Sequence, residues 1–435
     1  MEKNNFRKIA AITLFESAVQ WYCFLLYGTA AGTVFHKVFF SQTGNGTTAL
    51  ILSYMSFAIG YIAGPFGAIF FGHIGDRKGR KVTMYASLLM MGISKSIIGI
   101  LPPAASAGVG VVIVLQLMRL AQCFGRGGTW GGGILMAYEN VPENKRSFYA
   151  AIPQIGLPIG FGLSSILIAV PTLLLPEDIF FTWGWRIPFL AAIILTLIVI
   201  RQKGEMMETE DYKKAQAKLE AEEAEGKKHK VGFIPMVKGY WKTLLLGCGT
   251  RWVDGTFYNI FIVWILSYCI NWLGMPLIQT YIITIIACIF KIPFTLFGGW
   301  CAQKLGNTRT FVIGALSSAV LIIPTLKVIE LSKGNLAITI VGIVLGWSIA
   351  YNLIWAVISS LWSSYFETEV RYSGISFVYH VPSFLVAGMV PTICTLLINY
   401  GKGDTIYVGI YSTVVALISA ACALALKARH DRGEK

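Results

Sequence analysis

The sequence predicts an all-α membrane protein, with twelve transmembrane helices in two six-helix halves and both termini in the cytoplasm. Composition is the first reason. Of the 435 residues, 55% are hydrophobic and only 13% are charged, which leaves too little polar surface for a soluble protein. The second reason is the length of the apolar runs, and the third is the placement of Lys and Arg between them.

Each apolar run is long enough to cross the hydrocarbon core of a bilayer, which takes about 20 residues in a helix. The runs lie at 9–35, 47–71, 82–101, 108–139, 147–175, 184–200, 242–273, 277–302, 310–330, 335–366, 371–400 and 404–426. We therefore expect a transmembrane helix at each run.

Basic residues concentrate on one side of the predicted membrane. With both termini in the cytoplasm, the outer segments contain Lys37, Arg186, Lys333 and Lys402 out of 36 Lys and Arg residues. Cytoplasmic segments carry the excess of positive charge in membrane proteins, so this orientation is favoured. The net charge of +14 follows from topology and does not indicate nucleic acid. We expect a multi-pass protein of the inner (plasma) membrane of the cell.

One long hydrophilic segment divides the chain into a six-helix bundle at 1–200, a cytoplasmic linker at 201–241 and a second bundle at 242–435. The linker is rich in both Lys and Glu, as a solvated connection would be. A turn at Gly299–Thr308 occupies the place in the second half that Gly72–Lys81 holds in the first. Parallel repeats of this kind place a substrate site between them, near the membrane midplane.

The basic turn after the second apolar run reads Gly-His-Ile-Gly-Asp-Arg-Lys-Gly-Arg-Lys. It resembles the loop between helices 2 and 3 of major facilitator superfamily transporters, which latches the cytoplasmic helix ends. In the latch that the resemblance implies, Asp76 meets the N-terminus of helix 11 and Arg80 pairs with Glu139. Its residues are Gly72, Asp76, Arg77, Gly79, Arg80 and Glu139.

Six further motifs occur in order at 21–31, 119–122, 127–132, 153–158, 183–189 and 371–374. Together they resemble the metabolite:proton symporter family within that superfamily, whose members carry proline and betaine, shikimate, 2-oxoglutarate or citrate. The resemblance implies the major facilitator fold and alternating access, without a cofactor. The eight cysteines show no spacing typical of a metal site.

Intramembrane carboxylates of that family are replaced in this chain. Helix 1 usually reads Glu-Trp-Tyr-Asp, where this chain has Gln20-Trp-Tyr-Cys23. Helix 4 usually reads Gly-Gly-Glu, where Thr129 takes the third place, and helix 10 usually ends Glu-Leu-Phe-Pro-Thr, where Ser364 opens the motif. The resemblance therefore leaves proton coupling open.

Few ionisable residues remain inside the apolar runs. Each is a functional candidate, because a charge at the bilayer centre costs a few kcal/mol unless it is paired or hydrated. They are Glu16, Lys95, Arg119, Arg126, Arg251, Asp254, Lys291 and, near an outer end, Lys327. Arg251 and Asp254, three residues apart, can pair on one helix; the pair is either structural or part of energy coupling.

Two polar stripes predict opposite walls of the substrate site. They are Arg119, Gln122, Arg126 and Trp130 on helix 4, and Glu16, Gln20, Cys23 and Tyr27 on helix 1. Lys291, in helix 8, adds a cation from the second half, which either pairs with Asp254 on the neighbouring helix or faces the substrate.

Cations outnumber acids in this interior, which favours an anionic partner, either the substrate or chloride. Arg119 and Arg126 suit a carboxylate, because a guanidinium binds it through two parallel hydrogen bonds, whereas Lys291 is a point charge. We expect a secondary transporter of a small organic anion. The alternative is a betaine- or amino-acid-like zwitterion moved without proton coupling, since aromatic rings near the same depth could enclose a quaternary ammonium group.

Glu16 and Asp254 are the candidate proton carriers. Asp254 has Arg251 within reach, and an opposite charge favours the ionised carboxylate, which makes Asp254 a poor proton acceptor near neutral pH. We therefore expect any proton symport to depend on Glu16. The alternative from a different functional class is a membrane sensor, which would bind its ligand without transporting it. No nucleophile, metal site or carboxylate pair suggests an enzyme. We expect a monomer whose partners are the small molecule, the lipid bilayer and, if transport is coupled, a proton.

Overall fold

A computed structural model describes residues 3–43, 45–78, 80–128, 145–203 and 233–434. In these ranges the chain forms helices joined by short turns, without strands. The helices of the first half are α1 (Lys3–Ala30), α2 (His36–Val38), α3 (Gly46–Lys78), α4 (Arg80–Ile100), α5 (Ala104–Ala107), α6 (Gly110–Gly127), α8 (Arg146–Ala150), α9 (Gly156–Leu174), α10 (Glu177–Ile179) and α11 (Arg186–Lys203). Those of the second half are α13 (Phe233–Asn259), α14 (Ile265–Asn271), α15 (Leu277–Leu305), α16 (Asn307–Leu331), α17 (Leu336–Ile343), α18 (Asn352–Tyr365), α19 (Thr368–His380), α20 (Val390–Tyr400) and α21 (Ile406–Asp431).

These helices coincide with the predicted apolar runs wherever the runs are described. Within the described residues, eight helical segments are long and apolar enough to cross a membrane by length and composition. The all-helical class is thus confirmed, and the number of twelve spans stays a prediction. Helices α3, α9, α15 and α16 each contain an internal proline, which membrane helices tolerate because neighbouring groups satisfy the freed carbonyl.

In the part of the chain that the structure describes, five π-helical segments interrupt or extend the helices: η1 (Ala31–Phe35), η5 (Phe180–Gly184), η6 (Ile260–Trp264), η7 (Val344–Ala350) and η8 (Phe384–Gly388). Segments η1 and η6 continue the first long helix of each half and touch one another. A Cβ atom on Gly32 would lie 3.2 Å from the Val263 carbonyl oxygen. Nearby, the hydroxyl of Tyr54 donates to Ser267 Oγ at 2.6 Å, so the halves are tightly joined at this end.

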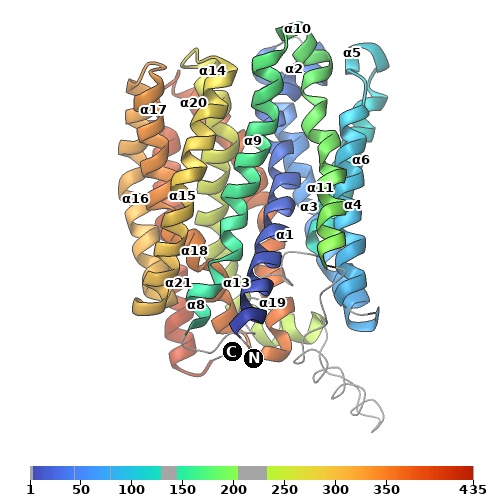
Figure 1. Cartoon of the computed structure of the whole chain (residues 1–435). Coiled ribbons are helices and arrows are strands. Elements are labelled where there is room, and N and C mark those ends of the chain that lie inside the picture. The colour runs from blue at the N-terminus through green and yellow to red at the C-terminus, as the bar shows by residue number, and fades with distance from the viewer. Residues whose placement is uncertain (1–2, 44, 79, 129–144, 204–232, 435) are drawn as a thin grey trace.

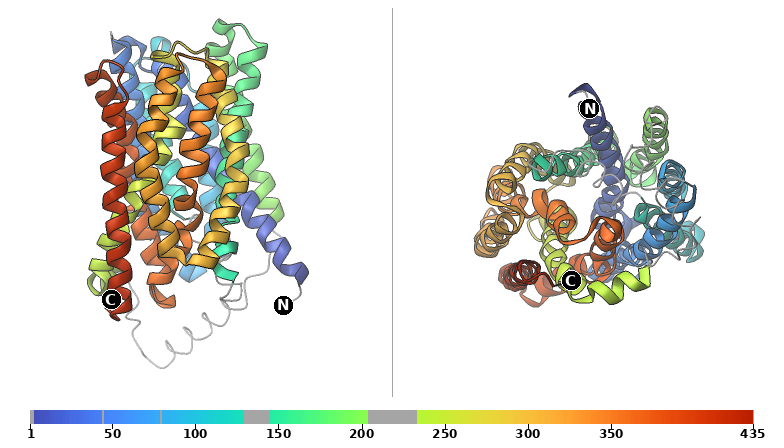
Figure 2. Two further views of the ribbon diagram at one scale, coloured as in Figure 1. Left: turned by 90° about the vertical axis from the view of Figure 1, so that its left-hand side faces the viewer. Right: turned by 90° about the horizontal axis from the view of Figure 1, so that it is seen from below.

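The two halves stand side by side, the first in blue to green and the second in yellow to red (Figures 1 and 2). They interlock, because α9 packs against α15 and α3 packs against η8 and α19. Helix α1 begins and α21 ends at the same end of the molecule (Figure 1).

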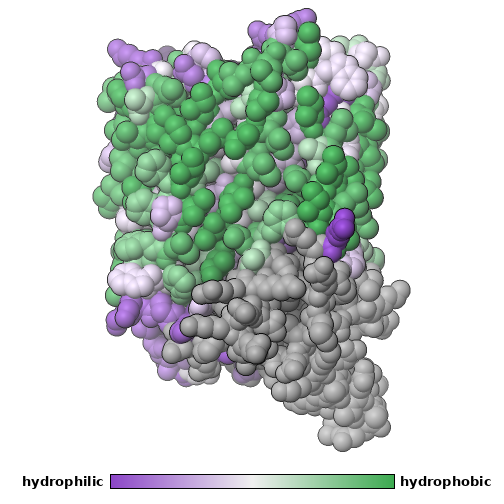
Figure 3. All heavy atoms as spheres, viewed as in Figure 1, coloured by the Kyte–Doolittle hydropathy of each residue, from purple (hydrophilic) through white to green (hydrophobic). Residues whose placement is uncertain are grey.

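An apolar band covers the visible face of the molecule between more polar ends (Figure 3). Large hydrophobic side chains point outward from it, among them Leu174, Val320 and Leu331, which are 70% or more exposed. Water would disfavour so large an apolar surface, so the band faces lipid. Polar side chains are instead buried where the helices meet.

Candidate substrate site

Arg126, at the end of α6, reaches across the boundary between the halves. Its Nη2 donates to the hydroxyl of Tyr379 on α19 at 2.5 Å. Its guanidinium carbon lies 3.8 Å from the ring centroid of Phe24 and 4.6 Å from that of Trp21. The side chain is 4% exposed, and cation–π attraction is strongest in such desolvated positions. Rings of α1 and a hydroxyl of the other half therefore hold this guanidinium.

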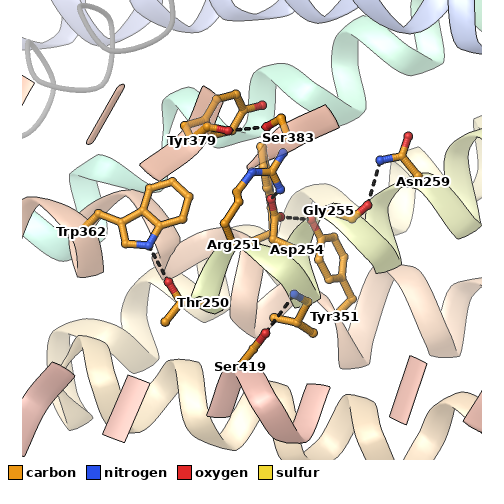
Figure 4. A network of polar contacts seen from close by, with 12 residues as sticks. Thr250, Arg251, Asp254, Gly255, Asn259, Tyr351, Trp362, Tyr379, Ser383 and Ser419 are labelled. Carbon is orange, nitrogen blue, oxygen red and sulfur yellow. Dashed lines mark hydrogen bonds and ion pairs between the residues drawn. The ribbon is translucent and has the colours of Figure 1, made fainter. Parts of the chain in front are cut away.

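Arg251 and Asp254 form an ion pair on α13 (Figure 4). Both side chains are 2% exposed. Tyr351, which precedes α18, donates its hydroxyl to Asp254 Oδ1, and the guanidinium carbon of Arg251 lies 4.5 Å from the ring centroid of Tyr379. Tyr379 thus contacts an arginine from each half, Arg126 through its hydroxyl and Arg251 through its ring.

Lys291, on α15, brings a third cation to this region. Its Nζ donates to Asn352 Oδ1 at 2.9 Å and to the Trp347 carbonyl at 3.3 Å. The same nitrogen lies 4.5 Å from the ring centroid of Tyr351, whose hydroxyl donates a hydrogen bond to Asp254. We call Arg126, Arg251, Asp254, Lys291 and Tyr379 the central cluster.

Aromatic rings from both halves border the central cluster. The ring centroid of Trp21 lies 5.4 Å from that of Trp355 and 5.7 Å from that of Tyr258. Trp355 donates its indole N–H to the Gln154 carbonyl at 3.0 Å. One wall of the cluster is therefore aromatic and is shared between α1, α13 and α18.

Arg119, one of the predicted anchors, lies inside the first half. Its Nη1 donates to Gln122 Oε1 at 2.8 Å, and its Nη2 donates to the Phe57 carbonyl at 3.3 Å. Gln122 in turn donates to the Cys23 carbonyl at 2.5 Å. Tyr27 shares a hydrogen bond with Ser56. The predicted stripe, which lies on α6, therefore divides. Arg119 and Gln122 connect α1, α3 and α6, while Arg126 contacts the other half.

Glu16 and Gln20 are buried on α1, 3% and 4% exposed. Trp130, like Gly79 and Glu139 of the predicted latch, lies outside the described residues. For Gly72, Asp76, Arg77 and Arg80 the structure gives the backbone alone, at the end of α3 and the start of α4. The latch remains a prediction.

Sequence reasoning missed the tyrosines of the site. Tyr351 and Tyr379 each bond a charged residue that the sequence had singled out, yet neither carries a charge or belongs to a polar stripe. The packing of α18 and α19 against α13 brings them there. No group of three or more His, Cys, Asp or Glu that could hold a metal occurs within the described ranges.

The Major Facilitator Superfamily model matches residues 10–391. The inner membrane metabolite transport protein YhjE of Escherichia coli K12 is 34% identical, over 98% of this chain and 96% of the relative. The shikimate transporter of the same organism is 32% identical, over 96% and 94%. The proline/betaine transporter of Salmonella typhimurium is 26% identical, over 99% and 85%.

Solved structures agree in fold. The proton:xylose symporter XylE bound to 6-bromo-6-deoxy-D-glucose superposes with a TM-score of 0.76, at 17% identity, over 98% of this chain and 95% of that one. The chain is thus a multi-pass transporter of the cell membrane and not an enzyme, and it belongs to the major facilitator superfamily, in the metabolite:proton symporter family that its motifs resemble.

Proposed function

We propose that this protein is a secondary transporter that moves a small organic anion by alternating access, with the central cluster as its substrate site. The observation that carries the proposal is the charge of that cluster, which contains three cations, Arg126, Arg251 and Lys291, and one carboxylate, Asp254. A carboxylate substrate would balance this excess. The guanidinium of Arg126 is the best placed to bind it, because it can offer two parallel hydrogen bonds.

A zwitterion is the second candidate substrate, moved without proton coupling. The rings of Trp21, Tyr258 and Trp355 favour it, since aromatic faces attract a quaternary ammonium group. A relative named as a proline/betaine transporter supports this reading, and one named as a shikimate transporter supports the anion.

The proposal includes twelve transmembrane helices, cytoplasmic termini, a linker at 201–241 and a monomeric protein. In this topology the end that carries α2 and α14 faces outward. Tyr54 bonds Ser267 there, and Tyr281 donates to Thr33 Oγ1 at 3.2 Å. These bonds join the halves, so both must open when the site faces the outside.

Counterflow in proteoliposomes tests transport against simple ligand binding. Proteoliposomes that contain the protein and are preloaded with unlabelled organic acid should take up the labelled acid transiently. A membrane sensor would give no such accumulation. Shikimate, proline and glycine betaine are suitable first substrates, because relatives are named for all three, and proline and betaine represent the zwitterion.

An imposed pH gradient tests energy coupling. We expect Glu16→Gln to keep exchange but to lose accumulation driven by the gradient, because Glu16 is the proposed proton carrier. Glu177→Gln, on the exposed α10, is the control and should behave as wild type. If the gradient drives no uptake by the wild type, the protein is an exchanger or facilitator and Glu16 is structural.

A further inference from the structure

Two tyrosine hydroxyls beside the central cluster are buried without a hydrogen-bond partner in the described part of the chain. They belong to Tyr61 on α3 and Tyr258 on α13, and the two residues are 5% and 3% exposed. Burying a hydroxyl without a partner is unfavourable. Other buried tyrosines do have partners, for example Tyr22, which donates to the Pro188 carbonyl at 2.5 Å.

The two tyrosines flank Arg126, each separated from it by one aromatic ring. On one side, the ring of Phe24 contacts Arg126 at 3.8 Å and Tyr61 at 5.4 Å between centroids. On the other side, the ring of Trp21 contacts Arg126 at 4.6 Å and Tyr258 at 5.7 Å. Tyr61 comes from the first half and Tyr258 from the second.

Both phenol oxygens also lie within electrostatic range of Arg126, Arg251 and Tyr379. They therefore lie near Arg126, the residue that the proposed function assigns to the substrate carboxylate. A phenol hydroxyl can donate one hydrogen bond and accept others. A quaternary ammonium group can take part in neither kind, and an alkyl chain offers no partner.

We propose that Tyr61 and Tyr258 recognise hydroxyl groups of the substrate, so that the protein selects a hydroxylated carboxylate over a plain carboxylate or a betaine. This inference rests on the proposed function, because it takes Arg126 as the carboxylate anchor. A site built to bond a substrate hydroxyl discriminates strongly against the analogue that lacks it, since its own buried polar groups are then unpaired.

The test compares two ligands with one ring, cyclohexanecarboxylate and 3,4,5-trihydroxycyclohexanecarboxylate, by calorimetric titration of the full-length protein in nanodiscs. The wild type should bind the hydroxylated ligand more tightly. Tyr61→Phe and Tyr258→Phe should each reduce that preference about tenfold while leaving the affinity for cyclohexanecarboxylate unchanged. Tyr22→Phe, the matched control, should keep the preference. Because the two tyrosines lie in different halves, either variant suffices if the other does not fold.

An unchanged preference in both tyrosine variants would overturn the inference, as would tighter binding of glycine betaine than of either ring acid. The proposed function would survive the first result if Arg126→Gln weakened both ring acids. It would fail together with the inference if the wild type bound no carboxylate.

Discussion

Arg119 and Arg126 lie two helical turns apart on α6, and both are buried, yet their surroundings differ. Arg119 bonds a side chain and a carbonyl of its own half, and its guanidinium carbon lies 4.5 Å from the ring centroid of Tyr27. Arg126 bonds Tyr379 of the other half. The difference shows that one periodic stripe can divide, because Arg119 bonds within its own half while Arg126 lies at the boundary between the halves, where the proposed function has the halves move.

Removing the carboxylate of the central cluster should have the largest effect on stability. Asp254→Asn leaves Arg251 buried beside a neutral amide, and breaking a buried ion pair costs about 3–5 kcal/mol. We expect a clear drop in the thermal unfolding temperature in detergent. The control is Asp178→Asn, on the exposed α10, which should change nothing. An unfolding temperature equal to that of wild type would show that the ion pair does not stabilise the fold.

A smaller loss of stability should follow Arg119→Gln. The variant leaves the Phe57 carbonyl and Gln122 Oε1 without this donor, and each unsatisfied buried group costs about 1–3 kcal/mol. Thermal unfolding should detect the loss. Ligand affinity in the folded fraction should not change, because Arg119 acts within its own half. A large loss of affinity at normal stability would instead place Arg119 in the binding site and remove the contrast with Arg126.

The smallest effect on stability is expected at Asp404, which pairs with Lys327 near the surface, in contrast to the buried Arg251–Asp254 pair. Hydrogen bonds from Lys327 Nζ and from the backbone N–H of Ile406 lower the pKa of Asp404 from its usual 3.8. Because the folded-state pKa is lowered, this stabilisation is present above pH 3.8 and is lost as the pH falls through the lower folded-state value.

Unfolding temperatures measured across that acidic range should therefore fall slightly more for wild type than for Asp404→Asn. Equal curves would mean that solvent screens the contact completely.

The sequence predicted the helices well and the site only in part. Apolar runs determine where a chain can cross a bilayer, so the approximate position of each helix could be read from these runs. The charged residues of the central cluster were also found, because a charge inside an apolar run is conspicuous. The sequence did not show which half each side chain contacts, since Arg119 and Arg126 share one periodic stripe. Tyr258 was noted only as one of many aromatic residues at this depth, and Tyr61 and Tyr379 carry no signal in an apolar run until α3 and α19 are packed against the rest.

Anion binding by Arg126→Gln tests the central claim most directly. Calorimetric titration of a carboxylate that the wild type binds should show affinity lower by about 30-fold or more, because losing one partner of a buried charged hydrogen bond costs roughly 2–5 kcal/mol. Arg126→Lys keeps the charge but loses the paired hydrogen bonds, so its affinity should lie between that of wild type and that of Arg126→Gln. Unchanged affinity in Arg126→Gln, at normal stability, would contradict the assignment of the central cluster as the substrate site.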